Sequence, residues 1–142
     1  MTRDGDFDLS SPNAFRRKKS DFDNRINLIN SSGADLYLSF HINYLDDSRY
    51  YGAQVFYTEG NEEIAEILQD SMNDNLDSPL KEKKLNSSIY MYKQLVVPGV
   101  LIECGFLSND KERKLLVNKE YQNRIINTVV EGLLNYYKKR NL

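Results

Sequence analysis

The sequence predicts an α/β fold, a three-layer sandwich in which helices flank a mostly parallel or mixed sheet. Short apolar runs of strand length alternate with longer segments in which apolar residues recur every three or four positions. The composition, 40% hydrophobic and 28% charged, is typical of a folded core. The length of 142 residues suits a single domain, and strand–helix alternation favours a layered α/β architecture.

The first twenty residues are polar, and the basic cluster at 16–19 is expected to be a solvated loop. A helical pattern begins at Asp21, where Asp21 or Ser20 can cap the first turn. The pattern stops at residues 31–33, so the first predicted helix is short.

Three strands are expected from short apolar or β-branched runs: residues 36–42, 53–57 and 100–102. The first and third should be buried, because their apolar runs are continuous rather than alternating. Residues 44–52 form a predicted loop. Residues 81–99 stay unassigned, because 81–84 are charged and 89–97 fit either a short helix or an extended segment.

Three further helices follow from apolar spacing: one capped by Asn61 that fades by residues 77–79, one over 110–117, and a last one through 125–137. The last helix has a wide apolar face. The basic residues 138–140 place positive charge at the negative end of its dipole.

Composition excludes several classes of protein. A formal net charge of -2 argues against a non-specific nucleic-acid binder. No apolar run approaches the roughly 20 residues that a membrane-spanning helix needs, and the first residues show no hydrophobic segment of a signal peptide. The single cysteine, Cys104, excludes an intrachain disulfide and is expected to be a small buried hydrophobe.

Two side chains stand out as candidates for chemistry. His41, the one histidine, lies near the end of the first predicted strand, and Glu103 directly follows the apolar run 100–102. Ligands of α/β proteins bind beyond the ends of strands, and a buried carboxylate calls for a partner such as a cation. A hydrogen-bonded structural histidine and a glutamate in an ion pair remain the alternatives.

Other catalytic patterns are missing from the sequence. No serine lies in a nucleophile-elbow glycine pattern, and there is no P-loop or Cys-x-x-Cys motif. Cys104 adjoins Glu103, but neighbours along a strand point to opposite faces, so the two do not share a site.

The segments Ser39–Asn43 and Pro98–Asn109, read together, resemble the catalytic domain of zinc-dependent N-acetylmuramoyl-L-alanine amidases of the family-3 type. Additional matches run along the whole chain: Thr2–Arg3, Arg25, Asn30, Gly52, Glu112, Leu115–Leu116 and Tyr121–Gln122. Within this family the chain is most similar to the germination-specific, spore-cortex branch.

The resemblance implies hydrolysis of the amide bond between N-acetylmuramic acid and L-alanine in peptidoglycan. It implies a Zn²⁺ site in which His41 is a ligand, with Glu103 as the catalytic glutamate beside the metal. Zinc lowers the pKa of a bound water toward about 7, and Glu103 would move the proton to the leaving amine. Residues 106–109 and the loop 44–51 would border the substrate groove.

The resemblance also implies two further zinc ligands, a histidine after the first strand of the fold and a glutamate on the next helix, which have no counterpart here. We therefore expect residues 1–142 to form the C-terminal two-thirds of one amidase domain, incomplete at its N-terminal side. The N-terminal portion would then be a partner that completes the site. An exported location, at the cell envelope or spore cortex, is expected from the family.

The alternative is a degenerate, non-catalytic amidase-like module that binds peptidoglycan or a regulatory protein. The basic cluster 16–19 is an available partner surface. A stable α/β fragment without a function of its own is a third possibility.

Overall fold

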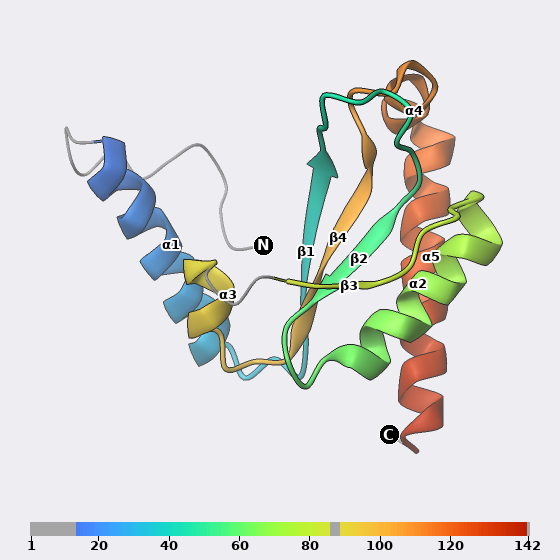
Figure 1. Ribbon diagram of the computed structural model, residues 1–142. Coiled ribbons are helices and arrows are strands. Elements are labelled where there is room, and N and C mark those ends of the chain that lie inside the picture. Colours follow the sequence, from blue (N-terminus) through green and yellow to red (C-terminus); the bar gives the residue numbers. More distant parts are fainter. Residues whose placement is uncertain (1–13, 86–88, 142) are drawn as a thin grey trace. The chain divides into compact units, whose positions relative to one another are not determined.

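The computed structural model describes residues 14–85 and 89–141, which fall into two compact units. The first unit contains residues 14–37 and 89–98, with helices α1 (Ala14–Ser31) and α3 (Tyr90–Gln94). The second unit contains residues 38–85 and 99–141, with the remaining helices and nearly all of the sheet (Figure 1).

Helix α1 begins seven residues earlier than the sequence predicted, and the loop expected over the basic cluster 16–19 is wrong. Arginine and lysine are good helix formers, and Lys19 makes an ion pair of 2.6 Å with Asp23 one turn later. Asp21 is not a cap: it lies inside the helix, nearly buried, and pairs with Arg25 at 2.9 Å.

Helix α3 resolves the open prediction for residues 81–99. In the first unit it is held by Asn30, whose amide donates to the Gln94 carbonyl and accepts the Val96 N–H, both at 3.0 Å. The rings of Tyr37 and Tyr92 stack with centroids 6.4 Å apart. Asn30 thus fastens α1 to α3, and the stacked rings join the first residue of β1 to α3.

The described sheet has four strands in the order β1-β4-β2-β3. Their bounds are Tyr37–Asn43 for β1, Gln54–Tyr57 for β2, Lys83–Lys84 for β3 and Gly99–Phe106 for β4. Strand β2 is antiparallel to β4 and parallel to β3. The α/β class is therefore confirmed, with a mixed sheet. The short β3 was not predicted.

Helices α2 (Glu62–Leu76) and α5 (Lys119–Lys139) pack side by side on the sheet, while the short α4 (Asp110–Leu116) follows β4 (Figure 1). Gly132 of α5 lies against Leu68 of α2, where a Cβ would meet the Leu68 Cδ2 at 2.7 Å. The largest fully buried side chains form the core between these layers: Val55, Ile64, Leu68, Gln69, Met72, Val100, Ile102 and Phe106.

The start of α2 differs from the prediction in one detail. Asn61 is the N-cap residue, but its side chain makes no capping hydrogen bond. Instead its Oδ1 accepts the Gly99 N–H at 3.1 Å, which ties the start of β4 to the start of α2.

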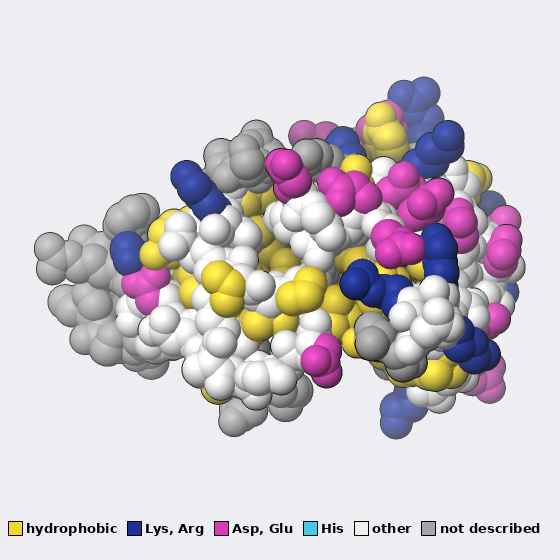
Figure 2. Space-filling model, turned by 90° about the horizontal axis from the view of Figure 1, so that it is seen from below, with side chains coloured by type: hydrophobic (Ala, Val, Ile, Leu, Met, Phe, Trp, Pro, Cys, Tyr) yellow, Lys and Arg dark blue, Asp and Glu magenta, His cyan; other side chains and the backbone are white. Residues whose placement is uncertain are grey.

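Charged side chains line the outer surface of the helices. Glu63 near the start of α2 pairs with Lys139 at the end of α5 at 3.0 Å. The view from below shows acidic and basic side chains next to one another over part of the surface (Figure 2). Within the described ranges, no helix is both long and apolar enough to cross a membrane.

Candidate active site

Glu103 lies within β4 rather than at its end, because the strand continues to Phe106. Its Cα is opposite that of Gln54 in the antiparallel pair with β2. The carboxylate oxygen Oε2 is buried and has no hydrogen-bond partner among the described residues. Burial raises the pKa of the Glu103 carboxyl above its ordinary value.

His41 lies on β1, and its Nε2 is 3.0 Å from the hydroxyl oxygen of Ser39. The prediction of a buried first strand is wrong for this stretch, since Phe40, His41 and Ile42 are exposed. The reason is the place of β1, which is the outermost strand of the described sheet. An outer strand has a neighbour on one side only.

The sheet brings the strands of His41 and Glu103 together. The Tyr37 N–H donates to the Pro98 carbonyl, and at the other end the Leu107 N–H donates to the Asn43 carbonyl, at 2.9 and 2.8 Å. Strands β1 and β4 are thus parallel neighbours, although their residues are about sixty positions apart in the sequence.

The two side chains also share a face of the sheet. Phe40 and Ile42 of β1, with Cys104 of β4, line a hollow of about 510 Å³ against Ile125 of α5, and His41 borders it from between its two neighbours. Because side chains alternate along a strand, His41 and Glu103 point to the face opposite this hollow. Cys104 points to the helices, and burial raises the pKa of its thiol to about 11.

The two segments predicted to border a groove contact each other. The Asn109 amide donates to the Ser48 carbonyl at 2.9 Å, and the Leu45 N–H donates to the Ser108 hydroxyl oxygen at 3.3 Å. This contact connects the loop after β1 to the segment after β4. Their role in binding substrate stays a prediction.

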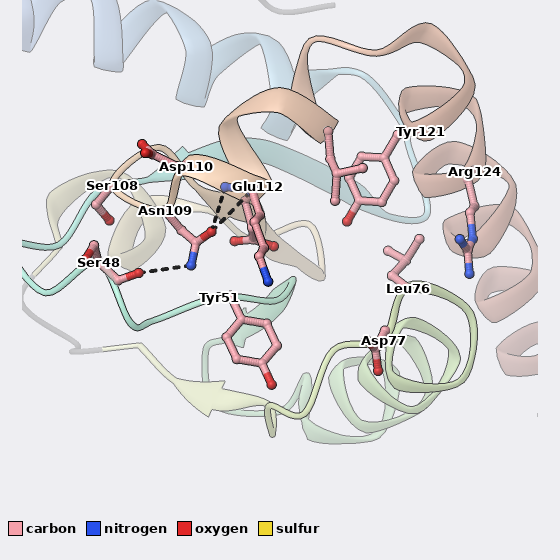
Figure 3. A pocket seen from close by; sticks show the side chains of 12 residues that line it. Ser48, Tyr51, Leu76, Asp77, Ser108, Asn109, Asp110, Glu112, Tyr121 and Arg124 are labelled. Carbon is pink, nitrogen blue, oxygen red and sulfur yellow. Dashed lines mark hydrogen bonds between the residues drawn. The ribbon is translucent and has the colours of Figure 1, made fainter.

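A larger hollow, of about 790 Å³, lies beside this contact and involves neither His41 nor Glu103 (Figure 3). Its walls come from α4, from the end of α2 and from the start of α5, with Glu112, Asp77 and Tyr121 among the lining residues. Burial, and secondarily the charge of Glu112, raises the pKa of the Tyr121 hydroxyl.

The metal ligands of the candidate site are incomplete in this part of the chain. A catalytic zinc ion takes three protein ligands and keeps one position open. Across residues 14–85 and 89–141, no group of three or more His, Cys, Asp or Glu side chains could hold a metal ion. The described residues alone do not fit a zinc site, and His41 is the single imidazole available.

Comparison with known proteins identifies the class to which this chain and its fold belong. The chain is a member of the N-acetylmuramoyl-L-alanine amidase family, whose family model matches residues 1–135. The germination-specific N-acetylmuramoyl-L-alanine amidase of Bacillus subtilis strain 168 is 37% identical over 146 residues, which cover 99% of this chain and 62% of that protein.

Solved structures agree with the family assignment. The CwlD amidase from Clostridioides difficile, whose structure is a complex with the GerS lipoprotein, matches 96% of this chain and 74% of its own with a TM-score of 0.87 and 33% identity. An N-acetylmuramoyl-L-alanine amidase from Clostridium difficile 630 gives a TM-score of 0.75 at 26% identity, with 82% and 65% covered. This chain spans 62% of the length of the Bacillus relative.

Sequence reasoning noted Glu112 only as a match to the family and gave it no role, yet its buried carboxylate joins two segments next to Glu103. One indication of this role was available in the sequence. A glutamate lies in the first turn of the short helix that follows a strand containing a glycine. Gln69 was missed because it sits on the apolar face of α2, where a polar residue breaks the pattern without revealing its partner.

Proposed function

We propose that this chain is part of an enzyme that hydrolyses the amide bond between N-acetylmuramic acid and L-alanine in peptidoglycan of the cell wall or spore cortex. The proposal is supported by family membership and by one structural observation above all. Glu103 carries a buried carboxylate oxygen that no described residue satisfies, on the strand next to the one that bears His41. Buried polar groups without a partner are few in folded proteins, and a catalytic role is one reason for such a group.

Glu103 acts as the general base. The carboxylate accepts a proton from the attacking water and passes it to the nitrogen of the departing L-alanine. A general base works best with a pKa near the working pH. The burial that raises the pKa of Glu103 moves this carboxyl in that direction.

His41 would be one ligand of a zinc ion, whose remaining ligands the described residues do not supply. Zinc, when bound, supplies positive charge that polarises the amide carbonyl. Ser39, 3.0 Å from the imidazole Nε2, helps to set the ring's orientation. A fixed ring tautomer and orientation are what a metal-bound histidine requires.

Partners and location follow from the relatives. The structure of the CwlD relative contains CwlD bound to the GerS lipoprotein. By analogy, we propose a regulatory protein as a partner of this chain. The names of the relatives refer to germination and to the cell wall. An exported protein at the envelope or spore cortex fits these names.

The test uses the intact protein with zinc and purified peptidoglycan. Wild type should release stem peptides with a free L-alanine amino group and should bind one zinc ion. Glu103→Gln should abolish release while zinc remains bound. His41→Ala should lose both. Glu66→Gln, which changes an exposed glutamate of α2, is the matched control and should behave as wild type.

Two outcomes would count against the proposal. Normal turnover by Glu103→Gln would show that Glu103 is not the general base. Saturable binding of peptidoglycan without zinc and without peptide release would instead support the non-catalytic module.

A further inference from the structure

Glu112 is a buried carboxylate that the proposed chemistry does not use. It lies in the first turn of α4 and is only 6% exposed. Its Oε1 accepts the N–H of Gly52 at 2.9 Å, and its Oε2 accepts the N–H of Phe106 at 2.7 Å. Hydrogen bonds to an ionised acceptor are roughly twice as strong as neutral ones.

One N–H belongs to Phe106, the last residue of β4, and the other to Gly52, two residues before β2 begins. Gln54 and Glu103 are the first register pair at this end of the β2–β4 ladder. Gly52 precedes Gln54 by two residues, and Phe106 follows Glu103 by three, so both lie just beyond this end of the ladder. The Glu112 carboxylate therefore bridges the end of β4 and the segment that leads into β2, beyond the last register pair of the two strands.

The backbone of β4 leaves room for this carboxylate. Gly105 has a φ of +150°, and a Cβ at this position would come within 3.1 Å of Glu112 Oε2. Glycine accepts this backbone conformation without strain and lets the carboxylate approach closely. The close-up view shows Glu112 reaching in from α4 beside the capping residue Asn109 (Figure 3).

We infer that Glu112 is a positioning residue for the reaction, which holds β4 against β2 and so fixes the place of the Glu103 carboxylate. The inference rests on the proposed function of Glu103. An amide at position 112 keeps one acceptor oxygen and turns a donor toward the other N–H. Glu112→Gln therefore breaks one arm of the bridge with almost no change in size.

The kinetic test compares Glu112→Gln with two controls in the intact, zinc-loaded protein acting on purified peptidoglycan. Misplacing a reacting group by about 1 Å costs up to about 100-fold in rate. We expect kcat to fall about 10- to 100-fold, with KM within about twofold of wild type. Asp110→Asn, on the exposed side of the same helix, should keep wild-type kcat.

Val129→Ala separates positioning from stability. Val129 is buried on α5 and makes none of these contacts, so its truncation lowers the Tm by loss of packing. At a temperature where all variants are folded, Val129→Ala should retain wild-type kcat. A matching fall of kcat in Val129→Ala, or unchanged kcat in Glu112→Gln, would overturn the inference.

Amide hydrogen exchange provides a readout that does not depend on activity. Glu112→Gln should speed exchange at Gly52 and Phe106 while the α2–α5 core keeps its protection. Gly105→Ala should produce the same pattern. The double variant should exchange little faster than either single variant, because both changes disrupt the same hydrogen bonds of Glu112. Unchanged exchange at Gly52 and Phe106 overturns the inference. Absence of peptide release by wild type would overturn the proposed function. The exchange measurement would still show whether Glu112 holds the N–H groups of Gly52 and Phe106.

Discussion

Gln54 and Glu103 are register partners across β2 and β4, and their side chains have opposite surroundings. The Gln54 amide donates to the Lys81 carbonyl at 2.8 Å, whereas Glu103 Oε2 is buried without a partner among the described residues. Burial without a hydrogen bond disfavours the charged carboxylate. Glu103 therefore weakens the fold at the point where the proposed chemistry takes place.

Glu103→Gln should stabilise the protein at pH 7. Burial raises the pKa of Glu103 in the folded state above the ordinary value of 4.5. Between these two values the folded state binds more protons than the unfolded state, so the free energy of unfolding falls as pH rises through this window. Thermal unfolding at pH 7 should show a higher Tm for the variant, and the difference should vanish below pH 4.5. A lower Tm at pH 7 would contradict this account.

The pH dependence of activity should also reflect the raised pKa of Glu103. A general base must be ionised, so kcat/KM should fall on the acid side with the pKa of Glu103 in the free enzyme. The midpoint of that acid limb should lie above the ordinary glutamate value of 4.5. The measurement is initial rate against pH at low substrate concentration, and a midpoint at or below 4.5 would remove Glu103 from this role.

Gln69→Leu should destabilise the second unit through β2. The fully buried Gln69 side chain accepts the Val55 N–H at 2.8 Å and donates to the Ala53 carbonyl at 3.0 Å. Leucine has a similar size but leaves the Val55 N–H unpaired. Urea unfolding should show a loss of about 1–3 kcal/mol. Gln94→Leu, at an exposed position, should change stability by less than about 0.5 kcal/mol.

Gly132→Ala should have an effect whose sign depends on Leu68. Alanine ordinarily stabilises a helix interior by about 1 kcal/mol relative to glycine. Here the new methyl would meet the fully buried Leu68 side chain at 2.7 Å, and overpacking costs about 1–3 kcal/mol. Thermal unfolding should show a lower Tm for Gly132→Ala in wild type and a higher Tm in a Leu68→Ala background. The same sign in both backgrounds would rule out the contact as the cause.

Sequence reasoning located the elements of the second unit well because hydrophobic periodicity is a local property. Strand β2 and helices α2, α4 and α5 lie within a few residues of their predicted positions. The antiparallel pairing of β2 with β4 and the exposure of β1 could not be predicted. Both depend on the order of strands in the sheet, which no single segment encodes.

The site was predicted in part. The residues alone indicate His41 and Glu103 as separate candidates, and the family resemblance implies one site for both. The structure places them on neighbouring strands; their roles as ligand and base stay predictions. The predicted start of α1 is seven residues too late, because a run of charged residues is typical of a loop, although lysine and arginine also support a helix. The bridge of Glu112 was not predictable, since its two partners are backbone N–H groups distant in the sequence.

The order of strands in the sheet has a consequence for how the protein is made. Strand β4 lies between β1 and β2 in space but follows both of them, and β3, in the chain. On a ribosome, β1 and β2 have no shared neighbour until residues 99–106 emerge, and such distant pairings form more slowly than local helices. Glu103 lies on this last strand. The strand that joins β1 to β2 therefore also brings the candidate base into the folding chain.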